Sequence, residues 1–364
     1  PIALAVLFVA FWMVRLIGEN LIGYVLEPLF ELYRPLVMYL SNLLESGFFH
    51  DVLIGKLIDG EIDFVQSLGV LTTGIFVPFG MVLPYILSFY FTLAILEDSG
   101  YLPRLATLSD NVFHKLGMHG YSIISVFLGL GCNVPGALST RILETRKERF
   151  ISATLMAIAV PCMAQTAMVF AILGPYGFGY LGIVFGTLLL VYLLGGFLMN
   201  RFVHGESPEF FLEIPPYRKP SFIAISKKTW MRIRGFLNEA VPWLFLGVVL
   251  INILYALGFI AWLGNVFSPV MEGWLDLPRE ASIVLLVGFF RKDLAVGMLL
   301  PLGMTPMQLV IAATLLTIYF PCIGTFAVLV KELGIRDMFK SMSIMIGTAL
   351  LVGGLMRLLL IGYP

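Results

Sequence analysis

The fold of this 364-residue chain is decided by two stretches of sequence, ISATLMAIAVPCMAQTAMVFAILG (151–174) and IAATLLTIYFPCIGTFAVLVKELG (311–334). They align without a gap, with Ile151 opposite Ile311, and ten of the 24 positions are identical. The identities include Pro161-Cys162 and Pro321-Cys322, and a shared apolar composition alone would not place a Pro-Cys pair in register. The chain is therefore predicted to contain an internal structural repeat.

The sequence upstream of each stretch extends the repeat. In the same register Cys132-Asn133 stands opposite Lys292-Asp293, and each pair interrupts an apolar segment. Further back, Val77-Pro78 and Val241-Pro242 each lie early in a long apolar stretch. Each half is thus predicted to contain a long helix, a broken segment and a helix that carries Pro-Cys. Repeats with broken helices are typical of secondary transporters, whose binding site lies between the repeats.

Composition limits the class of protein. Hydrophobic residues make up 59% of the chain and charged residues 13%, whereas soluble domains carry about 25% charged residues. The net charge is zero and no basic patch is present, so a soluble enzyme, a disordered chain and a nucleic-acid binder are excluded. Three cysteines inside apolar stretches argue against a disulfide framework. No nucleotide-binding or HExxH motif occurs, so we expect no enzyme activity from this chain.

Charge-free stretches predict an all-α, polytopic transmembrane helical bundle with about nine hydrophobic segments, of which two need not cross fully. We place these at 1–14, 64–96, 116–140, two within 150–200 (divided at Gly174–Gly177), 240–271, 281–290, 294–330 and 341–356. Residues 20–46 are predicted to form an amphipathic helix at the membrane interface, with a solvated loop as the alternative.

The predicted organisation has five parts. They are a first span with the interfacial segment (1–63), a first repeat (64–174), an extra span with a basic loop (175–235), a second repeat (236–334) and a C-terminal span (335–364).

Positive charge predicts the orientation of the segments. The loops at 141–149 and 201–234 are rich in Arg and Lys, so both are expected to be cytoplasmic, whereas the acidic loop at 272–280 is expected outside. The loop at 301–309, equivalent to 141–149, carries no charge. This difference favours an inverted pair of repeats, and the resulting topology places the N-terminus in the cytoplasm.

The first candidate site is the run GLGCNVPG at 129–136. The helix should be unwound here by Gly129, Gly131 and Pro135, which frees backbone carbonyls. Unwound backbone is tolerated at membrane depth only where it is buried in protein or lines a cavity. Cys132 and Asn133 place a thiol and a carboxamide at this break, which suits a borderline transition metal such as Fe(II). The alternative is a packing kink in which Cys132 fills space.

The two Pro-Cys pairs form the second candidate site. Because proline lacks an N–H, Pro161 and Pro321 should leave the carbonyls of Ala157 and Thr317 without a helical partner.

Each proline is followed by a cysteine that the weakened turn presents. Cys162 and Cys322 are therefore candidate metal ligands, with Met163 and Gln165 as weaker candidates on the transport path. The alternative is that these buried cysteines are inert packing residues.

Charged residues supply the remaining candidates. Lys292 and Asp293 lie inside an apolar segment, where unpaired charge is costly. They could neutralise each other, Asp293 could face a cation path while Lys292 holds the site in the absence of the cation, or both could lie at the interface. Glu97 and Asp98 could collect cations, although solvated carboxylates at a helix end explain them equally simply.

These residues resemble the membrane portion of the ferrous iron transport protein B family (FeoB). The resemblance covers nearly the whole chain and rests on LEDSGY at 96–101, GLGCNVPG at 129–136, the basic stretch at 141–149, FRKD at 290–293 and PCIGTF at 321–326. It implies two Gate modules related to those of nucleoside-type permeases, and import of Fe²⁺ as the substrate with no permanently bound cofactor. By resemblance, Cys132, Asn133, Cys162 and Cys322 would line the iron path.

The resemblance also implies surroundings for the chain. Family members usually carry an N-terminal cytoplasmic GTPase domain, which would precede Pro1 and is not in this sequence. The expected partners are the lipid bilayer of the inner membrane, Fe²⁺, such a GTPase domain or a small accessory protein, and further copies of the chain. The charged motif reads Lys292-Asp293 where the family has Lys-Glu. Two other functions stay open, a permease for a nucleoside-like solute and a non-transporting membrane scaffold.

Overall fold

The structure is a computed structural model that describes residues 2–43, 47–55, 69–205, 217–239, 241–256, 258–290, 292, 295 and 298–362. Within these ranges the elements are helical and there is no β-strand, which confirms the all-α class. The chain divides into two compact units. Unit 1 comprises Pro1–Leu105 and Leu212–Leu257, and unit 2 comprises Ala106–Phe211 and Gly258–Pro364. Each unit therefore takes residues from both predicted repeats.

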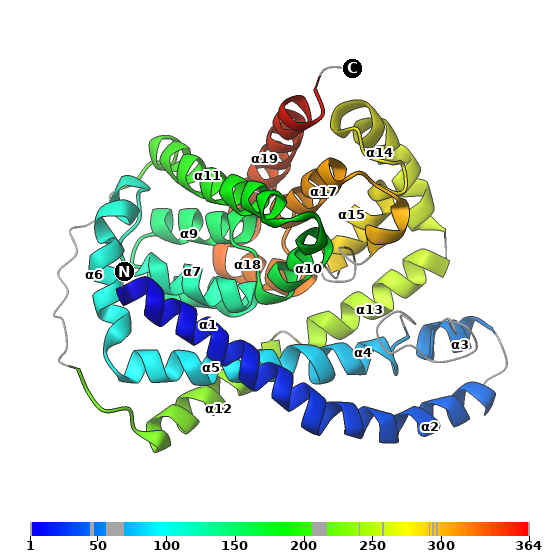
Figure 1. Cartoon of the computed structure of the whole chain (residues 1–364), viewed down its shortest axis with the longest axis horizontal. Helices are drawn as coiled ribbons and strands as arrows, with labels where there is room; N and C mark the ends of the chain where they lie inside the picture. The colour runs from blue at the N-terminus through cyan, green and yellow to red at the C-terminus, as the bar shows by residue number, and fades with distance from the viewer. Residues whose placement is uncertain are drawn as a thin grey trace. The chain divides into compact units, whose positions relative to one another are not determined.

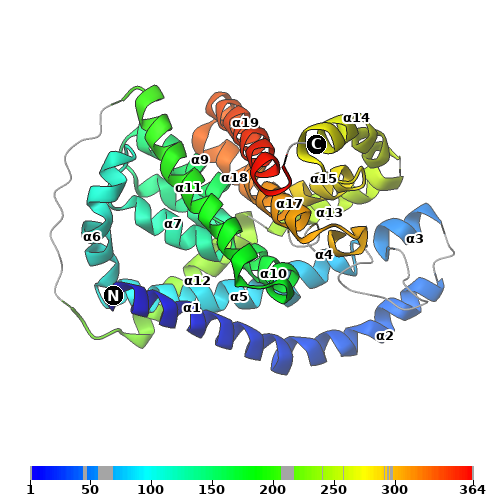
Figure 2. The same ribbon diagram turned by 45° about the horizontal axis from the view of Figure 1, so that its top comes forward.

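Unit 1 holds α1 to α5, α12, α13 and the start of α6. The bounds are α1 Ile2–Leu21, α2 Glu27–Leu43, α3 Phe48–Leu53, α4 Thr73–Ile75, α5 Leu83–Asp98, α6 Tyr101–Lys115, α12 Phe222–Glu239 and α13 Val241–Ala256. Helix α5 packs against α1 and α12, as both ribbon views show (Figures 1 and 2).

Unit 2 holds the rest of α6 and the helices that carry the candidate thiols. The bounds are α7 Ser122–Gly131, α8 Asn133–Ser139, α9 Arg146–Ala159, α10 Met163–Leu173, α11 Phe178–Phe202, α14 Phe259–Leu275, α15 Ala281–Phe290, α17 Pro306–Ile318, α18 Ile323–Leu333 and α19 Ile335–Leu360.

In the described part of the chain, six helical segments are long and apolar enough to cross a membrane. They are Pro78–Asp98, Arg146–Tyr176, Phe178–Phe202, Phe222–Leu254, Pro306–Leu333 and Ile335–Leu360. Two shorter apolar helices, α7 and α15, have ten residues each and coincide with broken segments of the sequence pattern.

Two predicted segments have the wrong extent. Residues 240–271 are not one span, because α13 ends at Ala256 and α14 begins after Gly258, whose φ of 70° is left-handed. Residues 294–330 contain a turn at Leu300–Leu302 followed by Gly303 with φ 61°, and the spanning helix begins only at Pro306. A glycine in this conformation ends a helix, whereas a hydropathy window averages over it.

The amphipathic segment after α1 is helical over most of its predicted length. A π-helical turn at Ile22–Leu26 leads into α2, which contains Pro35 and buries Phe30, Val37 and Ser41. Residues 44–46 and 56–68 lie outside the described residues.

The repeat is visible in the local structure of unit 2. Thr145 caps α9 through a capping box with Glu148, and Thr305 caps α17 through the same motif with Gln308. Short 3-10 turns precede both helices, at Thr140–Ile142 and Leu300–Leu302. All of these pairs keep the register of the sequence alignment. The two halves therefore share their turns and helix starts as well as their apolar composition.

The two repeated helices run in opposite directions. Arg146 begins the span that ends at Tyr176, and its Nε donates to Asp337 Oδ2 at 2.9 Å. Asp337 follows closely after Leu333, the end of the span that begins at Pro306. The start of the first span thus lies beside the end of the second, as an inverted repeat requires. Helices α9 and α17 each pack against both α11 and α19.

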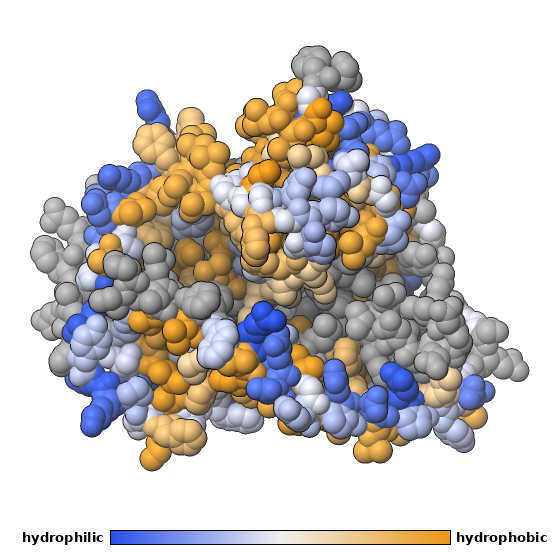
Figure 3. Space-filling view, viewed as in Figure 1, coloured by the Kyte–Doolittle hydropathy of each residue, from blue (hydrophilic) through white to orange (hydrophobic). Residues whose placement is uncertain are grey.

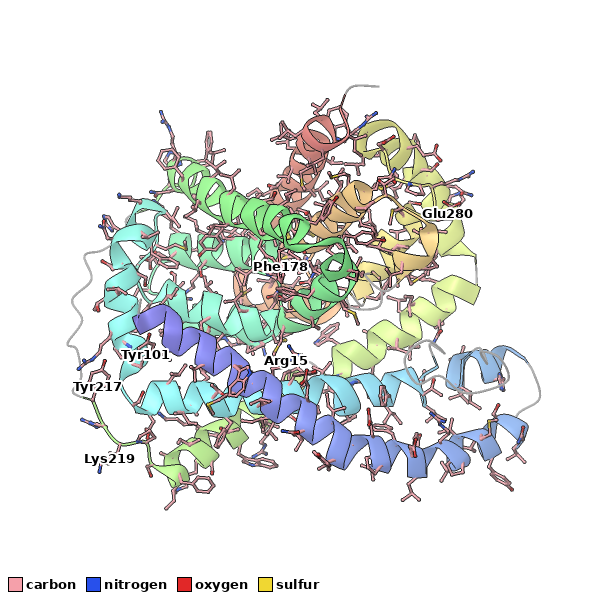
Figure 4. The ribbon with its side chains drawn as sticks, viewed as in Figure 1. Arg15, Tyr101, Phe178, Tyr217, Lys219 and Glu280 are labelled. Atoms are coloured by element: carbon pink, nitrogen blue, oxygen red, sulfur yellow. The ribbon has the colours of Figure 1, made fainter. Side chains whose placement is uncertain are left out.

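The outer helices of unit 2 expose apolar side chains. Figure 3 shows hydrophobic residues gathered over α11 and over α19. On α11 the exposed residues include Leu189, Leu190, Leu194, Phe197 and Leu198, and on α19 they include Leu351, Leu355 and Leu359. Phe178, labelled in Figure 4, is exposed at the start of α11. Such faces suit lipid acyl chains.

Close packing at the first break predicts a destabilising substitution. A Cβ added at Gly136 would clash with Met156 Sδ and would lie 2.9 Å from Gly129 Cα. We expect Gly136→Ala to lower the free energy of unfolding by about 1–3 kcal/mol, because a well-packed core resists added volume. Thermal unfolding in detergent measures the effect. Gly347→Ala is the control, since nothing lies within 4 Å of its added Cβ; equal melting temperatures for the two variants would contradict the prediction.

Candidate functional site at the helix breaks

Unit 2 brings the three cysteines together at helix starts. Cys132 ends α7 and caps α8 in an extended conformation, with φ −154° and ψ 133°. Cys162 caps α10 and Cys322 caps α18. None of the three is in a disulfide and each is partly buried. Cys322 Sγ lies 3.2 Å from Thr325 Oγ1, and Cys132 lies within range of electrostatic interaction with the other two cysteines. Thiols from both repeats therefore share one region, although they lie far apart in sequence.

The cysteines do not form a closed metal cage. Across the described residues, no three side chains of His, Cys, Asp or Glu are grouped closely enough to hold a metal ion. A cation in this region would therefore also need carbonyl, carboxamide or water ligands. Metal binding requires the thiolate form, and the partial positive charge of a helix N-terminus offsets part of the cost of a thiolate there.

The carbonyl end of α17 is occupied by side chains. Lys292, only 5% exposed, donates from Nζ to the carbonyl oxygen of Thr317 at 3.0 Å. This is the carbonyl that Pro321 was predicted to leave without a helical partner. Gln165 donates from Nε2 to the neighbouring carbonyl of Leu316 at 3.5 Å. At the break in the second repeat, side-chain donors thus bond backbone oxygens that lack helical partners. A broken helix at membrane depth requires such replacement donors.

Asn133 makes the corresponding contact in the first repeat. With its amide nitrogen facing the carbonyls, it donates to Gly129 O at 2.9 Å and to Val160 O at 3.3 Å; this orientation is assigned from the hydrogen-bond network. In both repeats, therefore, a residue of the broken segment donates to the carbonyl end of the helix that precedes Pro-Cys.

The weaker candidates have distinct places. Both ends of the Gln165 amide are used within the protein, because Oε1 accepts from the backbone N–H of Cys162 at 3.2 Å while Nε2 bonds Leu316. Met163 is the first residue of α10 and is partly buried. Asp293 lies outside the described residues. Gln165 therefore ties the first repeat to the second.

Glu97 and Asp98 are engaged in ion pairs within unit 1. Arg232 Nη2 lies 2.6 Å from Glu97 Oε2, and Lys228 Nζ lies 3.5 Å from Glu97 and 3.6 Å from Asp98. Asp98 also accepts from the N–H of Ser221 at 2.7 Å. These contacts tie the end of α5 to α12.

Several polar contacts in unit 2 were not predicted. Arg141 forms an ion pair with Glu332 that joins the two repeats, and Thr154 Oγ1 lies 2.9 Å from Ser341 Oγ, which joins the first repeat to the C-terminal span. Glu148 is fully buried beside His119, with 3.2 Å between Oε1 and Nε2. The charged residues around Glu148 in the sequence are typical of a solvated loop. The Thr-x-x-Glu pattern was the sequence signal that could have placed Glu148 at a helix start.

The fold and the breaks define a polytopic helical membrane protein whose two repeated helices in unit 2 run in opposite directions. A family model described as "Gate: Nucleoside recognition" matches residues 79–176 and 237–336, and one described as "Ferrous iron transport protein B C terminus" matches residues 181–232. The chain belongs to the Gate family and, within it, to the ferrous iron transport protein B family.

Curated relatives agree with this assignment. An Fe(2+) transporter FeoB of Methanocaldococcus jannaschii is 27% identical over 341 residues, covering 81% of this chain and 48% of the relative. One of Staphylococcus aureus (strain COL) is 27% identical, with 75% and 46% covered, and one of Synechocystis sp. is 28% identical, with 82% and 48% covered. The chain thus spans about half the length of these relatives.

A solved structure of CNTnw in an outward-facing state covers 97% of this chain and 90% of its own, with a TM-score of 0.49 and 16% identity.

Proposed function

We propose that this chain forms the membrane path for ferrous iron import. The observation that carries the proposal is the meeting of Cys132, Cys162 and Cys322 at helix breaks of both repeats, beside backbone carbonyls with weakened helical bonds. Thiolates and carbonyl oxygens suit Fe²⁺ as substrate. The relatives named Fe(2+) transporter FeoB support the same substrate.

The expected mechanism follows from the ligand set. Fe²⁺ loses part of its hydration shell on entering the breaks, and thiolates together with carbonyl or Asn133 oxygens replace that water. Metal ligation requires the thiolate form of a cysteine, so we expect the affinity for Fe²⁺ to depend on pH. Because no closed cage is present among the described residues, binding stays weak enough for release. Opposed movement of the inverted repeats would then expose the ion to the other side.

The surroundings of the chain complete the proposal. We infer an inner-membrane location with the N-terminus in the cytoplasm, because the basic loops at 141–149 and 201–234 favour the cytoplasmic side. A fusion of Fe(2+) transport protein A with FeoB in Porphyromonas gingivalis, 32% identical over 162 residues, supports a small accessory partner. That match covers 43% of this chain and 19% of the relative. A cytoplasmic GTPase domain and further copies of the chain are the other proposed partners.

A nucleoside-like solute is the second candidate substrate. The description of the Gate model as nucleoside recognition favours it. This function would use hydrogen-bonding side chains and would be indifferent to loss of the thiols.

Anaerobic uptake into proteoliposomes tests these functions. We expect Fe²⁺ uptake to be at least about tenfold lower than that of the wild type in Cys132→Ser and in the Cys162→Ser, Cys322→Ser double variant. The reason is that loss of a soft ligand weakens the binding of the cation along the path. Gly347→Ala, which has open space around it, controls for handling, and thermal unfolding checks that each variant is folded. Unchanged Fe²⁺ uptake in the cysteine variants would overturn the thiol path. Uptake of a labelled nucleoside in place of Fe²⁺ would establish the second candidate, and uptake of neither would favour a scaffold.

A further inference from the structure

Lys292 poses an energetic problem within unit 2. Its side chain is buried, and among the described residues its ammonium has no carboxylate partner within ion-pair distance. An isolated buried charge costs several kcal/mol unless other groups compensate it. Compensation comes from the Thr317 carbonyl at 3.0 Å and from the negative end of the α17 dipole. The ammonium is therefore held by the groups that would hold a cation.

The thiols belong to the same neighbourhood. Lys292 lies within range of electrostatic interaction with Cys322 and Cys162, the two cysteines that follow the prolines. The carbonyl it occupies exists as a free acceptor only because Pro321 supplies no N–H. Lys292 thus bonds a backbone oxygen and interacts electrostatically with two thiols, and these group types are the ligands proposed for Fe²⁺.

The repeat reveals an asymmetry at this position. Lys292 stands opposite Cys132 when the two repeats are aligned. The first repeat places a potential ligand at its break, whereas the second repeat places a buried lysine at the same point. A lysine there repels any cation that approaches, so its role is different from that of a ligand.

We propose that the Lys292 ammonium is a tethered cation that occupies the second-repeat half of the metal site in the empty protein and is displaced by the incoming Fe²⁺. The proposal rests on the proposed function. Two consequences follow from competition for the same oxygen and thiols. Metal affinity is held down, and return of the ammonium to the Thr317 carbonyl promotes release. Lys292 is accordingly a residue that tunes affinity, and it touches no metal itself.

Equilibrium binding of Fe²⁺ under anaerobic conditions tests the proposal on the full chain in nanodiscs. Lys292→Gln keeps a donor for Thr317 but removes the charge, and Lys292→Leu removes both and cannot ligate metal. We expect both to bind Fe²⁺ at least about tenfold more tightly than the wild type, because charge repulsion over a few ångströms in a protein amounts to several kcal/mol. Lys292→Arg keeps the charge and should bind as weakly as the wild type. In proteoliposomes the neutral variants should show a lower KM together with a lower kcat.

The controls separate this proposal from the function beneath it. Cys322→Ser is measured in the same assay and should lose affinity. Unchanged or weaker binding by both neutral variants, with affinity still lost in Cys322→Ser, would overturn the tethered cation and leave the thiol path intact. Fe²⁺ binding that none of the four variants alters would overturn the thiol path and the tethered cation together. Lys340→Leu, which removes a largely exposed charge on α19, should leave the affinity unchanged and so excludes an effect of net charge.

Discussion

Glu148→Ala is expected to destabilise the protein more than any other single substitution considered for this chain. The Glu148 side chain is 1% exposed and lies 3.2 Å from His119, whose side chain is 8% exposed. It also completes the capping box of α9 with Thr145. Breaking a buried polar contact costs about 1–3 kcal/mol, and loss of a helix cap costs about 1 kcal/mol more. The melting temperature in detergent and the yield of folded protein should both fall sharply.

Two matched variants sharpen this expectation. Glu148→Gln keeps the size and the hydrogen-bonding oxygen of the side chain, so it should retain more stability than alanine does. Glu144→Ala removes an exposed carboxylate from the same loop and should change stability by no more than about 0.5 kcal/mol. If the alanine variants at 144 and 148 melt at the same temperature, the buried pair contributes nothing and the expectation is wrong.

Pro321→Ala is expected to abolish most transport while leaving stability unchanged or improved. Alanine supplies the N–H that proline lacks, so the Thr317 carbonyl gains a helical donor that competes with Lys292. Proline inside a helix costs about 3 kcal/mol relative to alanine. The substitution therefore raises the equilibrium constant for a continuous helix through 317–321 by a factor of about 100 over the wild type. Cys322 would then leave its place at the start of α18. We expect Fe²⁺ uptake to fall by more than about tenfold.

Pro306→Ala is the control for that experiment. Pro306 occupies the first turn of α17, after the Thr305 cap, where a missing N–H breaks no helical bond. Its uptake and melting temperature should match those of the wild type. Wild-type uptake by Pro321→Ala would show that the interruption between α17 and α18 is not needed for transport.

The sequence was most informative where a pattern is local. The Pro-Cys pairs, the break at Cys132 and the carbonyl of Thr317 follow from proline chemistry and from self-comparison of the chain. The partner of that carbonyl did not follow, because Lys292 lies 25 residues away and a repeat pattern contains no distances. The three thiols could be assigned to both halves but could not be brought together without the packing of unit 2.

The missed features have physical reasons of their own. Gly258 divides a stretch whose mean hydropathy is uniformly high, and only its left-handed φ of 70° reveals the turn. The sequence neighbours of Glu148 are Arg and Lys residues, which gave no sign that it is buried. Its buried neighbour in space is His119, and α7 and α8 separate these two residues in the sequence. Composition describes the surroundings of a residue in sequence, whereas burial depends on its surroundings in space.

The contacts that join the first repeat to the C-terminal span also have a consequence for biogenesis. Thr154 meets Ser341, and Arg146 meets Asp337, across 187 and 191 residues of chain. At a synthesis rate of about 5–20 residues per second, the second partner emerges roughly 10–40 seconds after the first. During that interval the buried hydroxyl of Thr154 in the nascent first repeat lacks its partner Ser341. Insertion machinery that shields α9 until α17 to α19 arrive would therefore raise the yield of correctly assembled protein.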